Sequence, residues 1–250
     1  MLGVLVTRPV EQAAGLDQSL SAAGYKPLHA PLLDIAPLPL DAGMRQQILD
    51  LDLYDILISV SANASRLALE HIDQYWPQLP FGQICCAVGE SSAAPLRQAG
   101  LEVSVPVRHD SEGLLALDEL SAVAGKRILI LRGDGGRETL AEGLRERGAR
   151  VEYLNLYQRL AVPYGPGELA AQIRQQALAC VLLTSGEACT LFIRQLADSA
   201  LLGQLTLIVP SKRVQDVAFA AGASHVLVSD GADDQALMNC LRKWKEAPCD

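Results

Sequence analysis

The sequence predicts an α/β protein built on parallel sheets. Short apolar strands alternate with helices of about ten residues, which is typical of consecutive βαβ units. The strands are apolar throughout, as expected of strands that helices cover on both faces. The same order of elements occurs twice within the 250 residues. A repeat of about half the chain indicates a duplicated unit.

The two repeats share landmarks at one offset of 124 residues. In each repeat an arginine ends the first strand, a glycine ends the first helix, and a serine follows a later strand. These pairs are Arg8 and Arg132, Gly24 and Gly148, and Ser61 and Ser185. Residues 87–105 are echoed more loosely by 208–228, where the spacing slips by a residue or two.

Each repeat is predicted to follow one order of elements. A short apolar strand leads through a turn into an amphipathic helix that ends at glycine, with leucines at i and i+4. A second strand follows within residues 25–33 and 150–158. Then come a helix, a strand (56–60 and 180–184), a helix, a strand, a helix, a strand and a last helix.

Two segments rich in proline and glycine, residues 34–43 and 159–168, are predicted breaks in this pattern. They cut the chain after the first strand–helix–strand of each repeat, not between the repeats. Periodicity therefore leaves two domain divisions open. The domains are either 1–124 and 125–250, or they are interleaved at the two breaks.

Composition excludes several classes of partner. The formal net charge of −8 argues against nucleic acid and anionic membranes as partners. An acidic ligand would therefore need locally placed cations.

We see no basic, apolar leader and no apolar run near eighteen residues, and we expect a cytoplasmic protein without a membrane span. The six cysteines lack metal-site spacing and are expected to be reduced, buried thiols.

The stretch ILILRGDGGRETL runs from an apolar strand through a glycine-rich turn into a helix. Gly133 and Gly135 match a dinucleotide-binding loop, but Glu138 stands at its third glycine position, and no Walker G-K-[ST] occurs. Such a strand-to-helix turn still offers backbone N–H groups to an anion. Arg132 and Arg137 flank it. Like Arg8, each is either a solvated residue at a helix start or a ligand group, and the mild cost of a cation beside a helix start favours the ligand role.

Five more turns are predicted at the same carboxyl edge, where open α/β sheets bind ligands. Apart from Glu90 and Glu187 they are poor in acids, and they are rich in serine, glycine and asparagine: Arg8–Gln12, Ser61–Ala64, Gly89–Ala93, Ser185–Ala188 and Ser211–Val214. The alternative is that Ser61, Ser91, Ser185 and Ser211 are ordinary helix N-caps. That is the simpler account of any one serine, whereas their recurrence in both repeats favours a shared anion-binding role.

The chain has few candidate catalytic residues. There is no G-x-S-x-G, no H-E-x-x-H and no paired-carboxylate signature, and the four histidines are scattered, which favours surface or capping roles. Tyr157 ends a strand beside a predicted break, where a tyrosine can donate a proton at a cleft. The alternative is a packed strand tyrosine.

Taken in order, a set of motifs along almost the whole chain resembles bacterial uroporphyrinogen-III synthases. Each motif is weak alone, but the ordered set with the RGDGGRE turn and the Y-x-R strand end is specific. The motifs are VLVTRP, PLLDIAPLP, DILISVSANA, AVGESSAAPLRQAGL, SEGLLAL, GKRILILRGDGGRETLAEGLRERGARVEYLNLYQR and LLTSGEA.

The resemblance implies two similar flavodoxin-like, doubly wound domains joined by a two-stranded linker. One domain would combine residues 1–34 with 165–250, the other would be 40–156, and the linkers would be about 35–39 and 157–164. The first strand–helix–strand of each repeat would then pack with the opposite repeat.

The resemblance also implies a cyclising lyase. Its substrate would be linear hydroxymethylbilane, an octacarboxylate, which closes to uroporphyrinogen III with loss of water and inversion of ring D. No cofactor or metal is implied, the substrate would bind in a cleft between the domains, and the upstream hydroxymethylbilane synthase is a candidate partner. We expect a monomer.

By the same resemblance Tyr157 is the candidate acid for the leaving hydroxyl. The candidate substrate-binding residues are Arg8, Ser61, Ala62, Asn63, Gly89, Ser91, Ser92, Arg132, Gly133, Asp134, Gly135, Arg137, Ser185, Gly186, Ser211, Lys212 and Arg213. In the family, hydroxyl residues fill the loop that here reads VPSKRV, so the hydroxyl role there falls to Ser211 alone. Lys212 and Arg213 add positive charge that suits a polycarboxylate.

Two rival functions use the same features. One is a non-enzymatic, two-domain protein that binds a small anion and closes by a hinge, although no signalling appendage or DNA-binding helix pair accompanies it. The other is a different enzyme on the same duplicated scaffold. A degenerate family member acting beside another protein is disfavoured by the full set of motifs.

Overall fold

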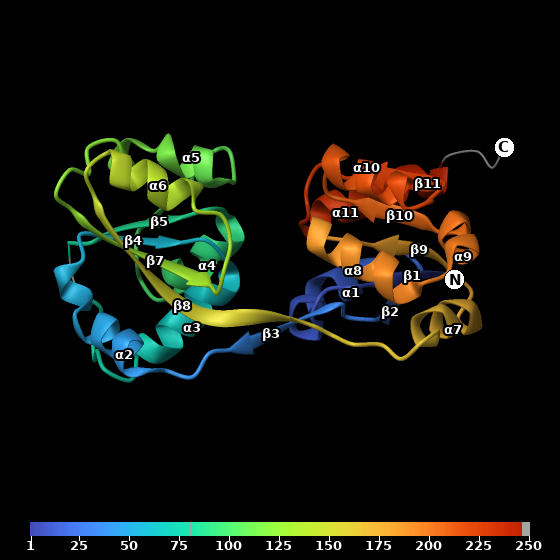
Figure 1. The fold of residues 1–250 in the computed structure, drawn as a ribbon, viewed down its shortest axis with the longest axis horizontal. Helices are drawn as coiled ribbons and strands as arrows, with labels where there is room; N and C mark the ends of the chain where they lie inside the picture. The colour runs from blue at the N-terminus through green and yellow to red at the C-terminus, as the bar shows by residue number, and fades with distance from the viewer. Residues whose placement is uncertain (81, 247–250) are drawn as a thin grey trace. The chain divides into compact units, whose positions relative to one another are not determined.

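Two parallel sheets, each belonging to its own unit, organise the computed structural model, which describes residues 1–80 and 82–246 (Figure 1). Unit 1 consists of Met1–Asp34 and the residues from Leu160 onward, and unit 2 is Ile35–Arg159. The chain passes from one unit to the other in β3 (Leu33–Pro37) and β8 (Arg150–Ala161), which are hydrogen-bonded neighbours. The domain boundaries given above stay a prediction.

The sheet of unit 1 has the order β11-β10-β9-β1-β2, and every pair in it is parallel. Its strands are β1 (Leu2–Val6), β2 (Tyr25–His29), β9 (Leu178–Leu182), β10 (Thr206–Val209) and β11 (His225–Val228). The first strand–helix–strand of the chain therefore pairs with strands of the second repeat. When these five strands are renumbered 1 to 5 in chain order, the sheet order is 2-1-3-4-5, which is that of flavodoxin-like sheets.

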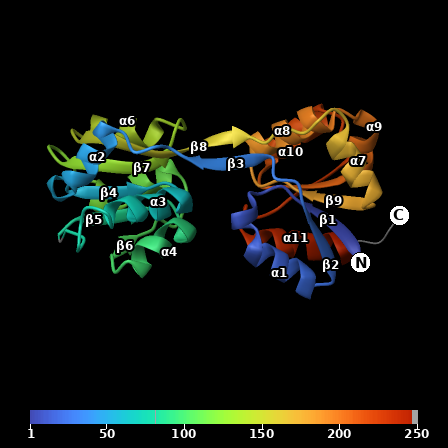
Figure 2. The same ribbon diagram turned by 90° about the horizontal axis from the view of Figure 1, so that it is seen from below.

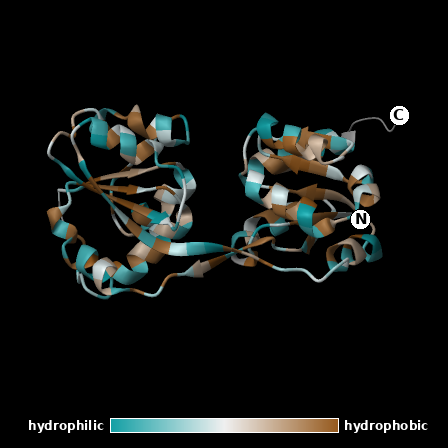
Figure 3. Cartoon of the chain, viewed as in Figure 1, coloured by the Kyte–Doolittle hydropathy of each residue, from teal (hydrophilic) through white to brown (hydrophobic). Residues whose placement is uncertain are grey.

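Helices cover both faces of this sheet (Figure 2). Val4 and Val6 point into the core under α1 and α11, whereas Leu5 points into the core under α7, α8, α9 and α10. The helices are α1 (Ala14–Ala22), α7 (Glu168–Gln175), α8 (Gly186–Leu196), α9 (Ser199–Gln204), α10 (Lys212–Ala220) and α11 (Asp234–Glu246). Burial on both faces explains why the strands are apolar throughout (Figure 3).

The sheet of unit 2 has the order β3-β8-β7-β4-β5-β6, and β8 through β6 are parallel. Its remaining strands are β4 (Ile56–Ser59), β5 (Ile84–Ala87), β6 (Val103–Ser104) and β7 (Arg127–Gly133). Helices α2 (Ala42–Leu49), α3 (Ala62–Ile72) and α4 (Glu90–Gln98) lie on one side, with α4 against α3. Helices α5 (Ser111–Leu115) and α6 (Thr139–Glu146) cover the other face.

The structure confirms the α/β class and the repeated order of elements. Helices α3 and α8 keep the 124-residue offset, whereas the offset between β5 and β10 is shorter by two residues. Gly24 and Gly148, predicted to end helices, have φ of 81° and 86°, which only glycine adopts without strain. Three short 3-10 helices, Val10–Gln12, Leu51–Leu53 and Asp118–Leu120, and helix α9 were not predicted.

Three of the predicted element boundaries are wrong. Residues 25–33 form the strand β2 only as far as His29, because the chain bends at Leu32 before β3 begins at Leu33. The expected break at 34–43 is instead a strand up to Pro37, and the break at 159–168 begins only after Ala161. Both segments stay extended because β3 and β8 pair with each other.

The expectation of buried thiols is confirmed for the five described cysteines, all of which are free and buried. Burial raises the pKa of Cys85 and of Cys189 to about 11, so both stay protonated at neutral pH. Cys249 lies outside the described residues. Among the described helices, none is long and apolar enough to cross a bilayer.

One buried hydroxyl links the loops that follow β4 and β5. Ser65, on α3, is 0% exposed, and its Oγ lies 2.7 Å from Ser59 Oγ and 2.6 Å from the carbonyl oxygen of Ser92 on α4. The carbonyl oxygen of Ser61, at 3.3 Å, is a second acceptor for the same hydroxyl proton. These contacts fix the starts of α3 and α4 relative to strand β4.

We expect Ser65→Ala to lower the free energy of unfolding by about 1–3 kcal/mol, because buried polar groups lose their partner. Urea denaturation measures this. The control is Ser19→Ala, which removes a hydroxyl that donates to the Gly15 carbonyl along the surface of α1 and should cost less than about 0.5 kcal/mol. Equal effects of the two substitutions would show that the Ser65 contacts carry no special stability.

Candidate active site

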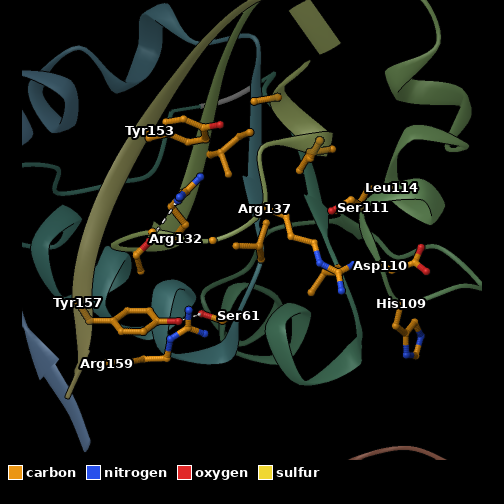
Figure 4. A pocket seen from close by; sticks show the side chains of 18 residues that line it. Ser61, His109, Asp110, Ser111, Leu114, Arg132, Arg137, Tyr153, Tyr157 and Arg159 are labelled. Atoms are coloured by element: carbon orange, nitrogen blue, oxygen red, sulfur yellow. Dashed lines mark hydrogen bonds between the residues drawn. The ribbon is translucent and has the colours of Figure 1, made fainter. Parts of the chain in front are cut away.

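A cavity of about 350 Å³ lies at the carboxyl ends of β7 and β4 in unit 2 (Figure 4). From β7 the chain continues to β8 on one side, and from β4 it continues to β5 on the other. Such a switch point leaves a crevice where α/β sheets bind ligands. The cavity is lined by Val60, Ser61, Val88, His109, Asp110, Ser111, Leu114, Ile130, Arg132, Gly133, Gly135, Gly136, Arg137, Leu140, Ala141, Tyr153, Tyr157 and Arg159.

A β-bulge in β8 aims Tyr157 at this cavity. Arg132 pairs with Asn155 but Gly133 pairs with Tyr157, so Leu156 is an extra residue in β8. Bulges redirect side chains and are common beside active sites. Tyr157, which is 6% exposed, therefore packs with Leu156 in the core under α2 and α3, while its hydroxyl reaches the cavity.

The Tyr157 hydroxyl is paired with the start of α3. Its oxygen lies 3.0 Å from Ser61 Oγ, and either oxygen can be the donor. Ser61 is the N-cap of α3 and accepts a hydrogen bond from the Ala64 N–H at 3.1 Å. Because Ser61 Oγ already accepts from the backbone, the pair leaves a hydroxyl proton at the tip of Tyr157 or Ser61 within reach of a ligand.

The glycine-rich turn after β7 closes directly on Tyr157. A Cβ at Gly133 would lie 2.6 Å from two ring carbons of Tyr157, so only glycine admits the ring here. The Asp134 N–H donates to the Tyr157 carbonyl oxygen at 2.6 Å. Gly135 and Gly136 have φ of 72° and 118°, which glycine adopts readily. The turn therefore needs its glycines both for space and for backbone conformation.

Arg132 is the most enclosed cation of the cavity, with 8% of its surface exposed. Its guanidinium carbon lies 4.2 Å from the centre of the Tyr153 ring, and Nη1 donates to Glu138 Oε1 at 3.1 Å. The Tyr153 hydroxyl donates to the other oxygen of Glu138. The hydrogen bonds from Tyr153 and Arg132 lower the pKa of Glu138, and burial with the Glu138 contact raises the pKa of Tyr153.

The opposite wall of the cavity comes from the start of α5. Asp110 is the N-cap and accepts from the Gly113 N–H at 2.8 Å. That bond, together with Arg108 and the charge of Arg137, lowers the pKa of Asp110, so this carboxyl is ionised at neutral pH. His109 also lines this wall, and its ring lies against Gly89.

The cavity is locally cationic in a chain whose net charge is −8. Arg132, Arg137 and Arg159 line it, against the single carboxylate of Asp110. Hydroxyls of serine and tyrosine supply further donors. No group of three or more metal-ligating side chains occurs among the residues the structure describes. The arrangement can bind a carboxylate and offer a hydroxyl proton beside it.

Comparison with known proteins decides the family. The sequence model described as Uroporphyrinogen-III synthase HemD matches residues 14–239. The chain is 34% identical to the uroporphyrinogen-III synthase of Escherichia coli K12 and 32% identical to that of Salmonella typhimurium. Each alignment covers 96% of this chain and the whole of the relative.

The chain belongs to the uroporphyrinogen-III synthase family. Solved structures of that family share its fold. A Thermus thermophilus uroporphyrinogen III synthase mutant aligns over 99% of this chain and 100% of its own, with a TM-score of 0.63 and 16% identity. The Helicobacter pylori uroporphyrinogen-III synthetase aligns over 98% and 100%, with a TM-score of 0.62 and 15% identity.

The cavity of this uroporphyrinogen-III synthase family member gathers six of the residues singled out in the sequence. They are Ser61, Arg132, Gly133, Gly135, Arg137 and Tyr157. Asp134 touches the site through its N–H bond to Tyr157. Ala62 and Asn63 lie in the first turn of α3, and Gly89, Ser91 and Ser92 lie at the start of α4, outside the lining of the cavity.

The other predicted residues belong to unit 1. Arg8, Ser185, Gly186, Ser211, Lys212 and Arg213 follow β1, β9 and β10 at the carboxyl edge of that sheet. Arg8 is already held by Asp234 and by the Ala232 carbonyl. Lys212 contacts Gln215 and Asp216 on its own helix. Whether these groups bind substrate stays a prediction.

The N-cap alternative holds for two of the four serines. Ser61 and Ser185 accept hydrogen bonds from Ala64 and Ala188. Ser211 occupies an N-cap position without a side-chain cap bond, and Ser91 lies inside α4, whose N-cap is Gly89. Capping does not exclude a ligand role, since Ser61 is both a cap and a wall of the cavity.

Several lining residues, and Glu138 behind them, were not named as site residues in the sequence. Asp110 stands before the apolar run of α5, and that helix-start pattern could have placed residues 109–111 at the sheet edge. Tyr153 and Arg159 lie on the same strand as Tyr157. The strict alternation of a strand does not predict which of them share a face, because the bulge changes the alternation. Glu138 was noted only for breaking the dinucleotide motif, and nothing local signals its bonds to Arg132 and Tyr153.

We expect Gly133→Ala to displace the Tyr157 ring and to lower the free energy of unfolding by about 1–3 kcal/mol through overpacking. A crystal structure should show the Ser61–Tyr157 hydrogen bond lost. The control is Gly125→Ala, where φ is 78° but an added Cβ meets nothing within 4 Å. Gly125→Ala should cost about 1–2 kcal/mol in strain and keep that bond. An intact bond in Gly133→Ala would contradict the steric account.

Proposed function

We propose that this protein closes linear hydroxymethylbilane to uroporphyrinogen III, with loss of water and inversion of ring D, in tetrapyrrole biosynthesis. The family membership supports the reaction, and one observation in the site carries it. The paired hydroxyls of Tyr157 and Ser61, 3.0 Å apart, lie at a switch-point cavity lined by three arginines. A proton donor thus lies beside groups that bind carboxylates.

The substrate suits this cavity by charge. Hydroxymethylbilane carries eight carboxylates, whereas the chain as a whole repels anions. Arg132 and Arg137 supply charged donors, and Gly135 and Gly136 supply backbone N–H groups near the start of α6. Carboxylates of acetate or propionate type would be held here, which orients the bilane relative to Tyr157.

In the proposed reaction the C–O bond of the hydroxymethyl group breaks as the lone pair of its pyrrole nitrogen assists. Tyr157 gives its proton to the leaving hydroxyl, which departs as water, and Ser61 keeps the phenol oriented. The substituted α-carbon of ring D then attacks the exposed methylene carbon and forms a new C–C bond. The older bond from that α-carbon to the methylene bridge of ring C breaks and re-forms at the free α-carbon of ring D, which inverts the ring. The proton lost from this second carbon returns to the Tyr157 phenolate and restores both the pyrrole and the phenol.

In this proposal the orientation of the bound bilane determines which carbon of ring D reacts. Binding of the carboxylates would favour attack by the substituted α-carbon of ring D over attack by its free α-carbon, which gives the type I ring. We place the enzyme among the cyclising hydro-lyases. An upstream hydroxymethylbilane synthase would supply the linear substrate. A purely anion-binding hinge protein is not favoured, because the chain belongs to an enzyme family.

The reaction is tested by an isomer assay without added cofactor. Hydroxymethylbilane closes unaided to the type I ring, so the purified protein should shift the product to type III. The porphyrins obtained by oxidation are separated by chromatography. Type I product at the unaided rate would refute the proposed function.

We expect Tyr157→Phe to lower kcat roughly 100-fold without abolishing type III product, because general-acid assistance is lost while binding groups remain. Tyr164→Phe is the matched control, since the Tyr164 hydroxyl donates to the Pro31 carbonyl in unit 1. It should leave kcat unchanged. Full activity in Tyr157→Phe would remove the acid role from this residue.

A further inference from the structure

Three contacts fix the plane of the Arg132 guanidinium. One face lies against the Tyr153 ring, at 4.2 Å from its centre. In the plane, Nε donates to the Gly133 carbonyl oxygen at 3.2 Å and Nη1 donates to Glu138 Oε1 at 3.1 Å. A planar group held on one face and along two of its edges has little freedom to rotate.

The remaining edge of Arg132 is available to a ligand. Among the residues that the structure describes, Nη2 has no hydrogen-bond partner. A Cβ built at Gly136 would lie 3.6 Å from Nη2, and Gly136 also lines the cavity. The glycine therefore leaves open space beside the free donors.

Glu138 holds Arg132 without lining the cavity itself. Its side chain is 46% exposed, so it approaches the guanidinium from the solvent side. Its second oxygen accepts from the Tyr153 hydroxyl, which fixes the carboxylate as well. Glu138 directly precedes α6 but makes no side-chain cap bond there. Its carboxylate is committed to Arg132 and Tyr153.

We propose that Glu138 and Tyr153 are positioning residues that aim the Nη2 edge of Arg132 at one carboxylate of the substrate. The proposal rests on the proposed function for the identity of the ligand. A preorganised arginine loses little side-chain entropy when it binds an anion. Because Arg132 and Glu138 stand at the two ends of the turn, their bond also holds residues 133–137 in shape.

The test separates positioning from general destabilisation by kinetics. We expect Glu138→Gln and Tyr153→Phe each to raise KM about threefold to tenfold with kcat unchanged within twofold, because ground-state and transition-state binding weaken together. Tyr153→Leu, which also removes the stacked ring, should raise KM further than Tyr153→Phe. The matched control is Glu142→Gln, an exposed glutamate one turn further along α6, and its KM should not change.

A double-mutant cycle shows whether these residues act through Arg132. In an Arg132→Met background, Tyr153→Phe and Glu138→Gln should raise KM no further, since the group they orient is absent. Additive effects in that background, or an unchanged KM in the single variants, would overturn the proposal. Thermal unfolding of each variant identifies any that fail to fold, and those are replaced by Glu138→Asp and Tyr153→His.

Direct binding keeps this test independent of turnover. Uroporphyrin III, a stable octacarboxylate, is titrated against each protein and followed by its fluorescence. Weaker binding in Glu138→Gln but not in Glu142→Gln supports the positioning roles. A wild-type protein that forms only the type I ring would refute the proposed function and leave that binding result standing. Equal affinity in the two variants overturns the positioning roles whatever the isomer assay gives.

Discussion

The pairing of β7 with β4 is the constraint on which the site depends. It joins strands of the two repeats in parallel, from Ile56 against Ile128 to Ser59 against Leu131. Because the two carboxyl ends coincide, the turn after β7 and the start of α3 meet at one point. The β8 strand, bound to the other side of β7, then brings Tyr157 to the same point. A shift of this register would separate Ser61 from Tyr157.

The site meets a charge problem by local means. An acidic protein that binds a polycarboxylate needs its cations close to the ligand and screened from its own acids. Arg132 satisfies this by burial, with Glu138 on its solvent side and its free edge toward the cavity. Asp110 is the acid that lines the cavity, and its carboxylate is occupied by the Gly113 N–H and Arg108. The ligand therefore meets donors, while the carboxylates are already engaged.

Much of the fold is predictable from local signals, because they are set by residues near in sequence. The repeat offset, the glycines that end α1 and α6, and the apolar strands all follow from periodicity and backbone preference. The site is predictable in part: Tyr157 and the RGDGGRE turn are visible as a strand end and a turn. The bulge at Leu156 and the contacts among Arg132, Glu138 and Tyr153 depend on strand pairing, which local patterns do not specify.

The central claim is that the switch-point cavity of unit 2 holds one carboxylate and one pyrrole ring of the substrate beside Tyr157. A crystal structure of the protein with uroporphyrin III bound tests it most directly. The account predicts a substrate carboxylate within hydrogen-bond distance of Arg132 Nη2, with a pyrrole ring next to the Tyr157 hydroxyl. A porphyrin bound with no contact to Arg132, Arg137 or Tyr157 would contradict it.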